Sequence, residues 1–486
     1  MGLSQALRDK VEITLIESDQ IQTVGVGEST VPPMQNFHRL LHVNEQDFLR
    51  ASAGTFKLAI LFDNWARDGD RYIHSFGVNG NSPFICDFLH FWLRSVSNGS
   101  KADLGEYCYE YQAAKAHRFS NTAQPKLNYA YHFDATLYSR FLRGLAEGYG
   151  VKRLEGKIRS VELHPESGYI EALMLESGER VAGDLFIDCT GFRALLTEGA
   201  LGTGFEDWAH WLPCDRAVAV QTEATEPAFP YTHAIAHEAG WRWAIPLQHR
   251  VGNGFVYCSQ HMSEEAATNQ LLAKSLGKPI VDPWSLKIRT GRRHKAWTKN
   301  CIALGLASGF VEPLESTSIH MFQTGVIRLL RLFPRSNEGI DPALVERYNL
   351  EARSEIESIR DFVIMHYHVT EREDTEFWRY TKNMSIPDSV SQRIQLFRES
   401  GHAVMDTHDL FRIDSWAQVM VGQRVIPHGY HPSADIMDEK TLKKYLDDFR
   451  ADVKRTVAQV PPHQDFVNQY CRAPEDIWKD RPASMS

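Results

Sequence analysis

The chain has 486 residues, of which 43% are hydrophobic and 24% charged, a composition typical of a globular protein with a large core. Its net charge of −9 argues against a nucleic-acid partner, and no apolar run is long enough to span a membrane. Seven scattered cysteines without a CxxC pair, and a polar start that does not predict a signal peptide, indicate a cytoplasmic protein with neither a disulfide framework nor a zinc site.

The first predicted element is a strand. VEITLIESD, residues 11–19, predicts a buried parallel strand that ends in an acid, Glu17. In a dinucleotide-binding unit such an acid holds a ribose hydroxyl, and a glycine-rich turn lies about 20 residues before it. Only ten residues precede Val11, and they contain one glycine. We therefore expect the first strand and the phosphate loop to be missing, either because the start is incomplete or because the cofactor binds differently.

Periodicity and turn residues predict the elements that follow. In TVGVGESTVPP, residues 23–33, Gly25 and Gly27 allow close backbone approach, although a plain turn fits equally well. The later predictions are a helix over 131–150, strands near 151–163, 169–175 and 184–192, a hairpin over 238–260 with VGNG as its turn, a strand, glycine-rich loop and helix over 300–333, and mostly helices after 340.

This order predicts an α/β fold. The strands near 11, 184 and 300 look alike and are separated by long insertions, which indicates one discontinuous cofactor module with a substrate module threaded through it. The expected cofactor module covers approximately 1–50, 150–200 and 285–335. The expected substrate module, mostly helical, covers approximately 51–149, 201–284 and 336–486.

Two stretches carry candidate chemistry for an anion and a planar ligand. GLASGFVEPLESTSIH, residues 305–320, leads into a helix whose free N-terminal amides suit a halide, phosphate or carboxylate, although a capped helix without a ligand is the plainer interpretation. GWRWAIP, residues 240–246, places Trp241 and Trp243 on one face of a strand as a rigid wall, unless they simply pack in the core.

A lysine lies inside the apolar run TFKLAILFDNW, residues 55–65. By itself, Lys57 is best explained as a surface lysine whose stem covers apolar neighbours. RTGRRHKAW, residues 289–297, is a basic cluster that we expect to be a solvated face, with an acidic partner protein or cofactor phosphates as the less favoured partners.

Taken together, these stretches resemble the flavin-dependent halogenases, and the tryptophan halogenase group in particular. WRWAIP matches the WxWxIP signature of that family, and GVGESTVPP, FKLAILFDNW, DLFIDCTGF and GLASGFVEPLESTSIH match its other motifs in the family's order. The resemblance extends from about residue 11 to at least 450. It implies an FAD-binding Rossmann-like three-layer module with a mostly helical substrate module.

The resemblance also implies a mechanism. Reduced FAD, O2 and a halide (chloride or bromide) give hypohalous acid, which Lys57 captures by hydrogen bonding or as a haloamine. Glu315 serves as acid or base, Thr317 and Ser318 bind the halide, and Trp241 and Trp243 keep the substrate from the flavin. For FAD the match implies Glu17, Gly25, Gly27, Ile158, Asp188, Gly191, Leu306 and Ile319.

The substrate and the partners follow less directly. His74 and Phe76 match residues that stack on an indole, although a core histidine is equally plausible. SWAQVMVGQRVIP, with Trp416 and Ala417, lacks the tyrosine pair that clamps a free amino acid in the family. We expect an indole or another electron-rich aromatic small molecule, a separate flavin reductase that supplies FADH2, and, by analogy, a homodimer. The alternatives are a flavin-dependent aromatic monooxygenase and a truncated non-catalytic relative.

Overall fold

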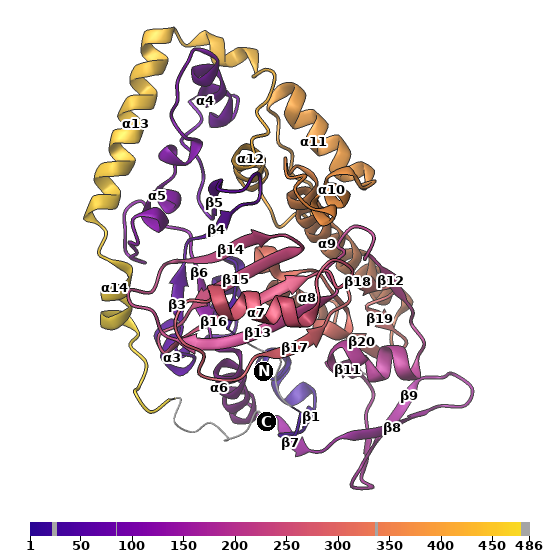
Figure 1. Ribbon diagram of the computed structural model, residues 1–486. Coiled ribbons are helices and arrows are strands. Elements are labelled where there is room, and N and C mark those ends of the chain that lie inside the picture. Colours follow the sequence, from indigo (N-terminus) through magenta and orange to yellow (C-terminus); the bar gives the residue numbers. More distant parts are fainter. Residues whose placement is uncertain (22–26, 84, 336–338, 478–486) are drawn as a thin grey trace.

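The centre of the molecule is a seven-stranded sheet (Figure 1). The structure is a computed structural model that describes residues 1–21, 27–83, 85–335 and 339–477, so Gly25 lies outside the described residues. Neighbouring strands run antiparallel except β14 and β4, which are parallel. The strand order is β17 (Trp284–Lys287), β13 (Arg216–Glu223), β16 (Arg250–Tyr257), β15 (Gly240–Pro246), β14 (Tyr231–His237), β4 (Ala59–Asp63) and β5 (Arg71–Ser75).

Smaller sheets surround the central one. Parallel pairing joins β1 (Thr14–Glu17) to β7 (Lys152–Glu155) and β11 (Phe186–Asp188) to β20 (Cys301–Ala303). The other strands are β2 (Glu28–Ser29), β6 (Ala130–Phe133) and β3 (Thr55–Lys57) in one sheet, β8 (Ile158–Leu163), β9 (Ile170–Leu175) and β10 (Arg180–Ala182) in another, β19 (Trp297–Thr298) beside β20, and β12 (Phe205–Asp207), β18 (Gly291–Arg293) and β21 (Gly309–Phe310).

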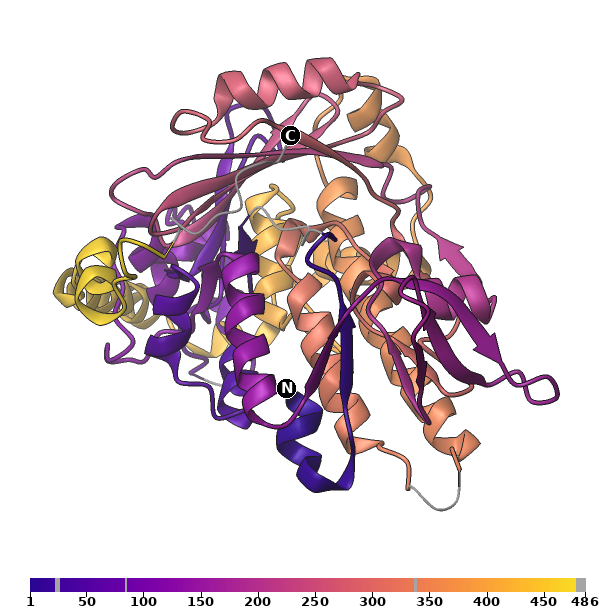
Figure 2. The same cartoon turned by 90° about the horizontal axis from the view of Figure 1, so that it is seen from below.

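Helices cover these sheets. Helix α7 (Glu264–Lys274) lies across one face of the central sheet, over β13 and β16 (Figure 2). The others are α1 (Gly2–Leu7), α2 (Pro33–Leu40), α3 (Glu45–Ala51), α4 (Phe88–Ser97), α5 (Tyr109–Lys115), α6 (Ala135–Gly148), α8 (Ser318–Arg331), α9 (Pro342–His368), α10 (Glu376–Asn383), α11 (Asp388–Ser400), α12 (Ile413–Gly422), α13 (Glu439–Gln459) and α14 (His463–Tyr470). Within the described ranges, no helix has both the length and the apolarity needed to cross a bilayer.

The mixed α/β prediction is confirmed, and so is the helical region after residue 340. The range assigned to a mostly helical substrate module also contains most of the seven-stranded sheet, because β4, β5 and β13–β16 all fall within it. Every residue of β16 is buried, as expected for a strand covered on both faces.

The predicted turn of the hairpin was wrong. The chain reverses at residues 247–249, and VGNG lies inside β16. Gly254 is a packing glycine, because a Cβ at this position would lie 1.9 Å from the indole of Trp243. A glycine that makes room for a ring gives the same sequence signal as one that makes a turn.

Two other boundaries also differ from the prediction. The helix expected over 131–150 is preceded by β6, and Asp134 separates the two elements by accepting hydrogen bonds from the backbone N–H groups of Thr136 and Leu137. The strand expected over 11–19 is only Thr14–Glu17, and its residues are exposed or half-buried, because in the described chain it pairs with β7 alone.

The basic cluster at 289–297 is a solvated face only in part, because Arg289, His294 and Lys295 are exposed whereas the two central arginines are buried. Arg292 and Arg293 lie in β18, where all three residues are buried. The Arg292 guanidinium lies 2.6 Å from Glu206 and 2.9 Å from Glu357, and Arg293 pairs with Glu198. Buried charges are tolerated when they are paired, and these carboxylates come from distant segments.

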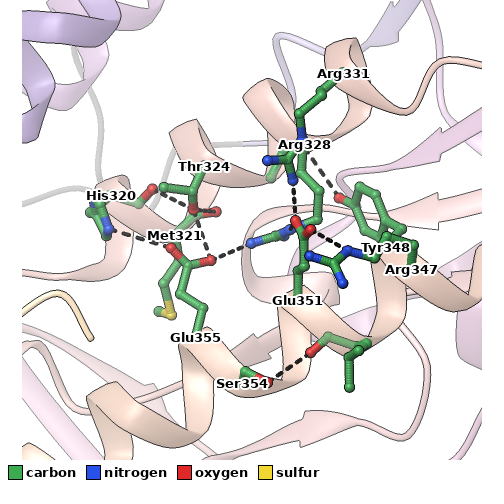
Figure 3. Close-up of polar contacts among 12 residues, drawn as sticks. His320, Met321, Thr324, Arg328, Arg331, Arg347, Tyr348, Glu351, Ser354 and Glu355 are labelled. Atoms are coloured by element: carbon green, nitrogen blue, oxygen red, sulfur yellow. Dashed lines mark hydrogen bonds and ion pairs between the residues drawn. The ribbon is translucent and has the colours of Figure 1, made fainter. Parts of the chain in front are cut away.

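A polar network holds helix α8 against α9 (Figure 3). Glu355 of α9 accepts hydrogen bonds from Thr324 (2.9 Å) and Arg328 (2.6 Å), and its other oxygen lies 3.4 Å from His320. Because His320 is in the first turn of α8, this network fixes the end of the helix that faces the candidate site.

Candidate active site

The Lys57 ammonium lies in the interior, at the end of strand β3. Its side chain is 0% exposed, and its Nζ donates to the carbonyl oxygen of Thr30 (3.0 Å) and to Ser316 Oγ (2.9 Å). The same nitrogen lies 5.0 Å from the centre of the Phe76 ring. The alternative of a surface lysine is therefore wrong.

Burial changes the ionisation of this lysine. It lowers the pKa of Lys57 from 10.5 to about 7, although the charge of Glu315 opposes the shift. Among described residues, no ion pair within 4.0 Å joins these two side chains. A neutral amine is consequently accessible near neutral pH.

Two imidazoles flank Glu315, which is also buried. One carboxylate oxygen lies 2.9 Å from His74 Nδ1, and the other lies 2.8 Å from His366 Nε2. Burial would raise the pKa of Glu315, but the two imidazoles outweigh it and hold the pKa at about 2. The group therefore remains a carboxylate over the physiological range.

The turn between Glu315 and α8 has an unusual backbone. Ser316 has a φ of 61°, in the left-handed region that non-glycine residues rarely adopt. This conformation turns the Ser316 hydroxyl toward Lys57 and leads directly into the first turn of α8. Thr317, the residue before the helix, is buried, and its Oγ1 has no hydrogen-bond partner in the described part of the chain. Ser318 begins the helix.

The two tryptophans share one face of β15, with ring centres 5.9 Å apart. Trp241 is buried and Trp243 half-buried. The Trp241 indole donates to Glu312 (3.0 Å), which also accepts from Tyr367 (2.6 Å), and the second Glu312 oxygen has no partner among described residues. Burial raises the pKa of Glu312 to about 7.

His74 and Phe76 flank the end of β5. His74 is buried against Glu315, and its Nε2 has no hydrogen-bond partner among described atoms. The backbone on both sides of Phe76 is held by Gln418 of α12, which accepts from Ser75 N (2.8 Å) and donates to Gly77 O (3.1 Å).

Trp416 and Ala417, which occupy the stretch without a tyrosine pair, are buried. The Trp416 indole packs edge-on against Phe362, with ring centres 5.0 Å apart. This part of α12 thus belongs to the core beneath the Phe76 segment.

The predicted FAD residues lie in separate elements. Glu17 ends β1, where Arg143 and Arg153 both donate to its Oε1. Gly27 has a φ of 143° and Gly191 a φ of 69°, and the space beside Gly191 is open. Ile158 in β8, Leu306 after β20, and Ile319 in α8 are half-buried.

Asp188 stabilises the backbone that follows it in the sequence. Its buried carboxylate accepts hydrogen bonds from the backbone N–H groups of Thr190, Leu196 and Thr197 and from the hydroxyls of Thr190 and Thr197. It therefore shapes the loop that carries Gly191, and its contribution to a cofactor site is through that loop.

Sequence reasoning missed several residues at this site. Glu312 stood in the quoted motif without a role, and His366 and Tyr367 are consecutive residues of α9 that contact Glu315 and Glu312 respectively. Spacing gives no signal for His366, because its partner lies on another element. A cavity of about 530 Å³ between α1, β1 and the end of α6 is lined by none of the predicted site residues.

Comparisons with known proteins agree with this architecture. The family model described as tryptophan halogenase matches residues 1–439. Tryptophan 6-halogenase SttH of Streptomyces toxytricini is 31% identical over 96% of this chain and 94% of its own length, and tryptophan 7-halogenase RebH of Lentzea aerocolonigenes is 34% identical over 82% and 78%. The solved structure of a flavin-dependent halogenase from Xanthomonas campestris matches with 49% identity and a TM-score of 0.95, over 97% of this chain and 95% of the other. The chain thus belongs to the tryptophan halogenase family and is a flavin-dependent halogenase.

Proposed function

We propose that this enzyme halogenates an indole or another electron-rich aromatic with FADH2, O2 and chloride or bromide, through hypohalous acid captured by Lys57. The observation that carries the proposal is the pair of buried, oppositely charged groups on either side of Ser316. An electrophilic halogen species needs a nucleophile to hold it, and the halogenated ring needs a base to take its proton.

Lys57 has the properties of that nucleophile. Its pKa of about 7 makes the neutral amine accessible near neutral pH. The amine either donates a hydrogen bond to hypohalous acid or attacks it, forming an N–halogen bond as water leaves. Holding the halogen on one fixed nitrogen presents it to one ring carbon at a time.

Glu315 suits the role of base. Because His74 and His366 keep it ionised, it can stabilise the cationic ring and accept the proton that leaves the halogenated carbon. The unpartnered His74 Nε2 supports an additional contact to the substrate.

The start of α8 supports halide binding. The backbone N–H groups of Thr317 and Ser318 stand at the N-terminus of a 14-residue helix, where the helix dipole favours an anion. The buried, unpartnered Thr317 hydroxyl adds a possible donor.

The residues present fit FAD in part. Gly191 and Gly27 offer backbone without a side chain, and Ile158, Leu306 and Ile319 offer half-buried apolar contacts. Glu17 offers a carboxylate, one oxygen of which accepts from Arg143 and Arg153. Reduced FAD supplies the electrons that activate O2.

Trp241 and Trp243 act as the wall that separates substrate from flavin. The Glu312 carboxyl supports this role, because it anchors the Trp241 indole to the segment that carries Glu315. A ring held by a hydrogen bond blocks a passage more reliably than one held by packing alone.

The substrate proposal rests on α12. Relatives are named as halogenases of tryptophan, whereas here the tyrosine-free stretch with Trp416 is packed into the core. We therefore infer an indole or another electron-rich arene rather than a clamped free amino acid. A separate flavin reductase, a cytoplasmic location and a homodimer complete the proposal.

The test is product mass after incubation with FADH2, O2, bromide and indole. A bromine isotope doublet is expected, whereas a gain of one oxygen would show the monooxygenase alternative. Lys57→Ala should abolish bromination and leave flavin oxidation intact, and a variant that brominates at the parent rate would refute the role of Lys57. Flavin absorbance of the reconstituted protein tests the non-catalytic alternative.

A further inference from the structure

A continuous chain of hydrogen bonds runs away from Lys57 through the interior. Lys57 Nζ donates to Ser316 Oγ (2.9 Å), and Ser316 donates to Ser29 Oγ (3.0 Å). Ser29 Oγ lies 2.7 Å from Thr232 Oγ1, which lies 2.9 Å from His132 Nε2. All five side chains are buried, and they come from five segments distant in sequence.

The direction of every bond follows from the far end of this chain. Thr55 Oγ1 donates its one hydrogen to the carbonyl oxygen of Pro246 (2.8 Å), so it must accept from His132 Nδ1, 3.3 Å away. Nδ1 therefore carries the imidazole proton, and Nε2 is an acceptor. Thr232 must then donate to His132, and Ser29 to Thr232.

We propose that Ser29, Thr232 and His132 form a proton relay that takes a proton from Lys57, through Ser316, when the amine captures halogen. Each hydroxyl already accepts on its Lys57 side and donates on its far side. A proton leaving Nζ therefore needs only one hop per bond to reach His132 Nε2, whose lone pair accepts the last hydrogen bond.

A proton relay is needed because Lys57 is buried. The proposal rests on the proposed role of Lys57, whose ammonium form cannot bond to halogen until it loses a proton. The ammonium first releases one proton to the relay. The neutral amine then attacks hypohalous acid: the N–halogen bond forms, the halogen–oxygen bond breaks, and a second N–H proton joins the departing hydroxide, so that water leaves. The released proton moves along the hydroxyls to His132 Nε2, because Lys57 itself has no solvent exposure.

Charges around the chain favour the resting state just described. Burial, the charge of Lys57 and the neighbouring His463 lower the pKa of His132, so it waits as a neutral acceptor. Glu315 faces Lys57 from the other side and favours its ammonium form. Once Lys57 becomes neutral, its share of the repulsion on His132 disappears.

The test compares bromination of indole at pH 6, where Lys57 is largely an ammonium, with bromination at pH 9, where it is already neutral. Thr232→Val removes two links and keeps the side-chain shape, Ser29→Ala also removes two links, and Thr232→Ser keeps the hydroxyl. Thr222→Val is the matched control, because Thr222 is equally buried in the same sheet and bonds to Asn253 instead. Flavin oxidation is followed throughout as a measure of intact folding.

We expect Thr232→Val and Ser29→Ala to lower bromination about tenfold at pH 6 and less than about twofold at pH 9. Thr232→Ser and Thr222→Val should match the parent at both pH values. An equal loss at both pH values, or no loss in either relay variant, would overturn the relay. If Lys57→Ala brominates at the parent rate, the proposed function fails instead. Should Thr232→Val not fold, Ser29→Ala decides the question.

Discussion

Replacing Lys57 by methionine should change how stability depends on pH. The side chain of methionine is similar in length and apolar, so the substitution removes the buried ionisable group with little change in packing. In the parent, the pKa of Lys57 falls from 10.5 to about 7 because the side chain is buried. The unfolded chain therefore binds one more proton than the folded chain between these two pH values.

The sign and the size follow from this difference. Stability rises with pH wherever the unfolded state binds more protons, by roughly 1.4 kcal/mol per pH unit for one group. Below pH 7 the folded parent carries the full cost of the buried charge, and this cost is relieved as the pH rises from 7 toward 10.5. Between pH 7 and 9 the parent should therefore gain roughly 2 kcal/mol relative to Lys57→Met, because the folded lysine is already half deprotonated at pH 7.

Thermal unfolding followed by circular dichroism, without FAD, measures this gain. For a chain of 486 residues, 1 kcal/mol corresponds to about 1 °C in Tm. The Tm difference between parent and variant should thus move by about 2 °C in favour of the parent from pH 7 to 9. Lys454→Met, at an exposed position of α13, is the control and should show no such drift. A constant difference for Lys57→Met would refute the argument from burial.

Substitutions at three further positions test the remaining parts of the site. Glu315→Gln should lower halogenation at least about a hundredfold while flavin oxidation continues, and a loss of both would point to misfolding. Glu312→Leu removes the acceptor for the Trp241 indole, whereas Glu312→Gln retains one. We expect only the leucine variant to divert FADH2 into hydrogen peroxide or oxygenated product, measured per FADH2 consumed, and equal diversion in both variants would contradict the anchoring role. Asp188→Asn puts an N–H group against backbone donors in the loop of Gly191, and should destabilise the protein by about 2 kcal/mol and weaken FAD binding in a fluorescence titration. Unchanged FAD affinity would show that the loop does not depend on this carboxylate.

Secondary-structure elements were predicted correctly where they depend on residues that are close together in the sequence. Alternating and continuous apolar runs predicted β8, β9 and β20, and the helical pattern after residue 340 predicted α9–α14. These elements depend on side chains within a few residues of one another. The hairpin turn was misplaced because Gly254 is needed to make room for the ring of Trp243, which lies on the neighbouring strand.

The burial of charged residues likewise could not be predicted from neighbours in the sequence. Arg292 looked like part of a solvated basic face, but Glu206 and Glu357 neutralise it in the interior. Ion pairs of this kind depend on which segments the fold brings together. A run of basic residues in the sequence therefore does not distinguish buried, paired arginines from exposed ones.

The sequence by itself determined the kinds of element, their order, and, through motifs such as WRWAIP and EPLES, the family to which the chain belongs. Only the tertiary structure decided the ionisation and the connections of the candidate groups. His74 reaches Glu315 across 241 residues of chain, and Lys57 meets Ser316 across 259. The physical reason is that a pKa and a hydrogen bond depend on burial and on atoms within a few ångströms, and folding sets both of these independently of separation along the chain.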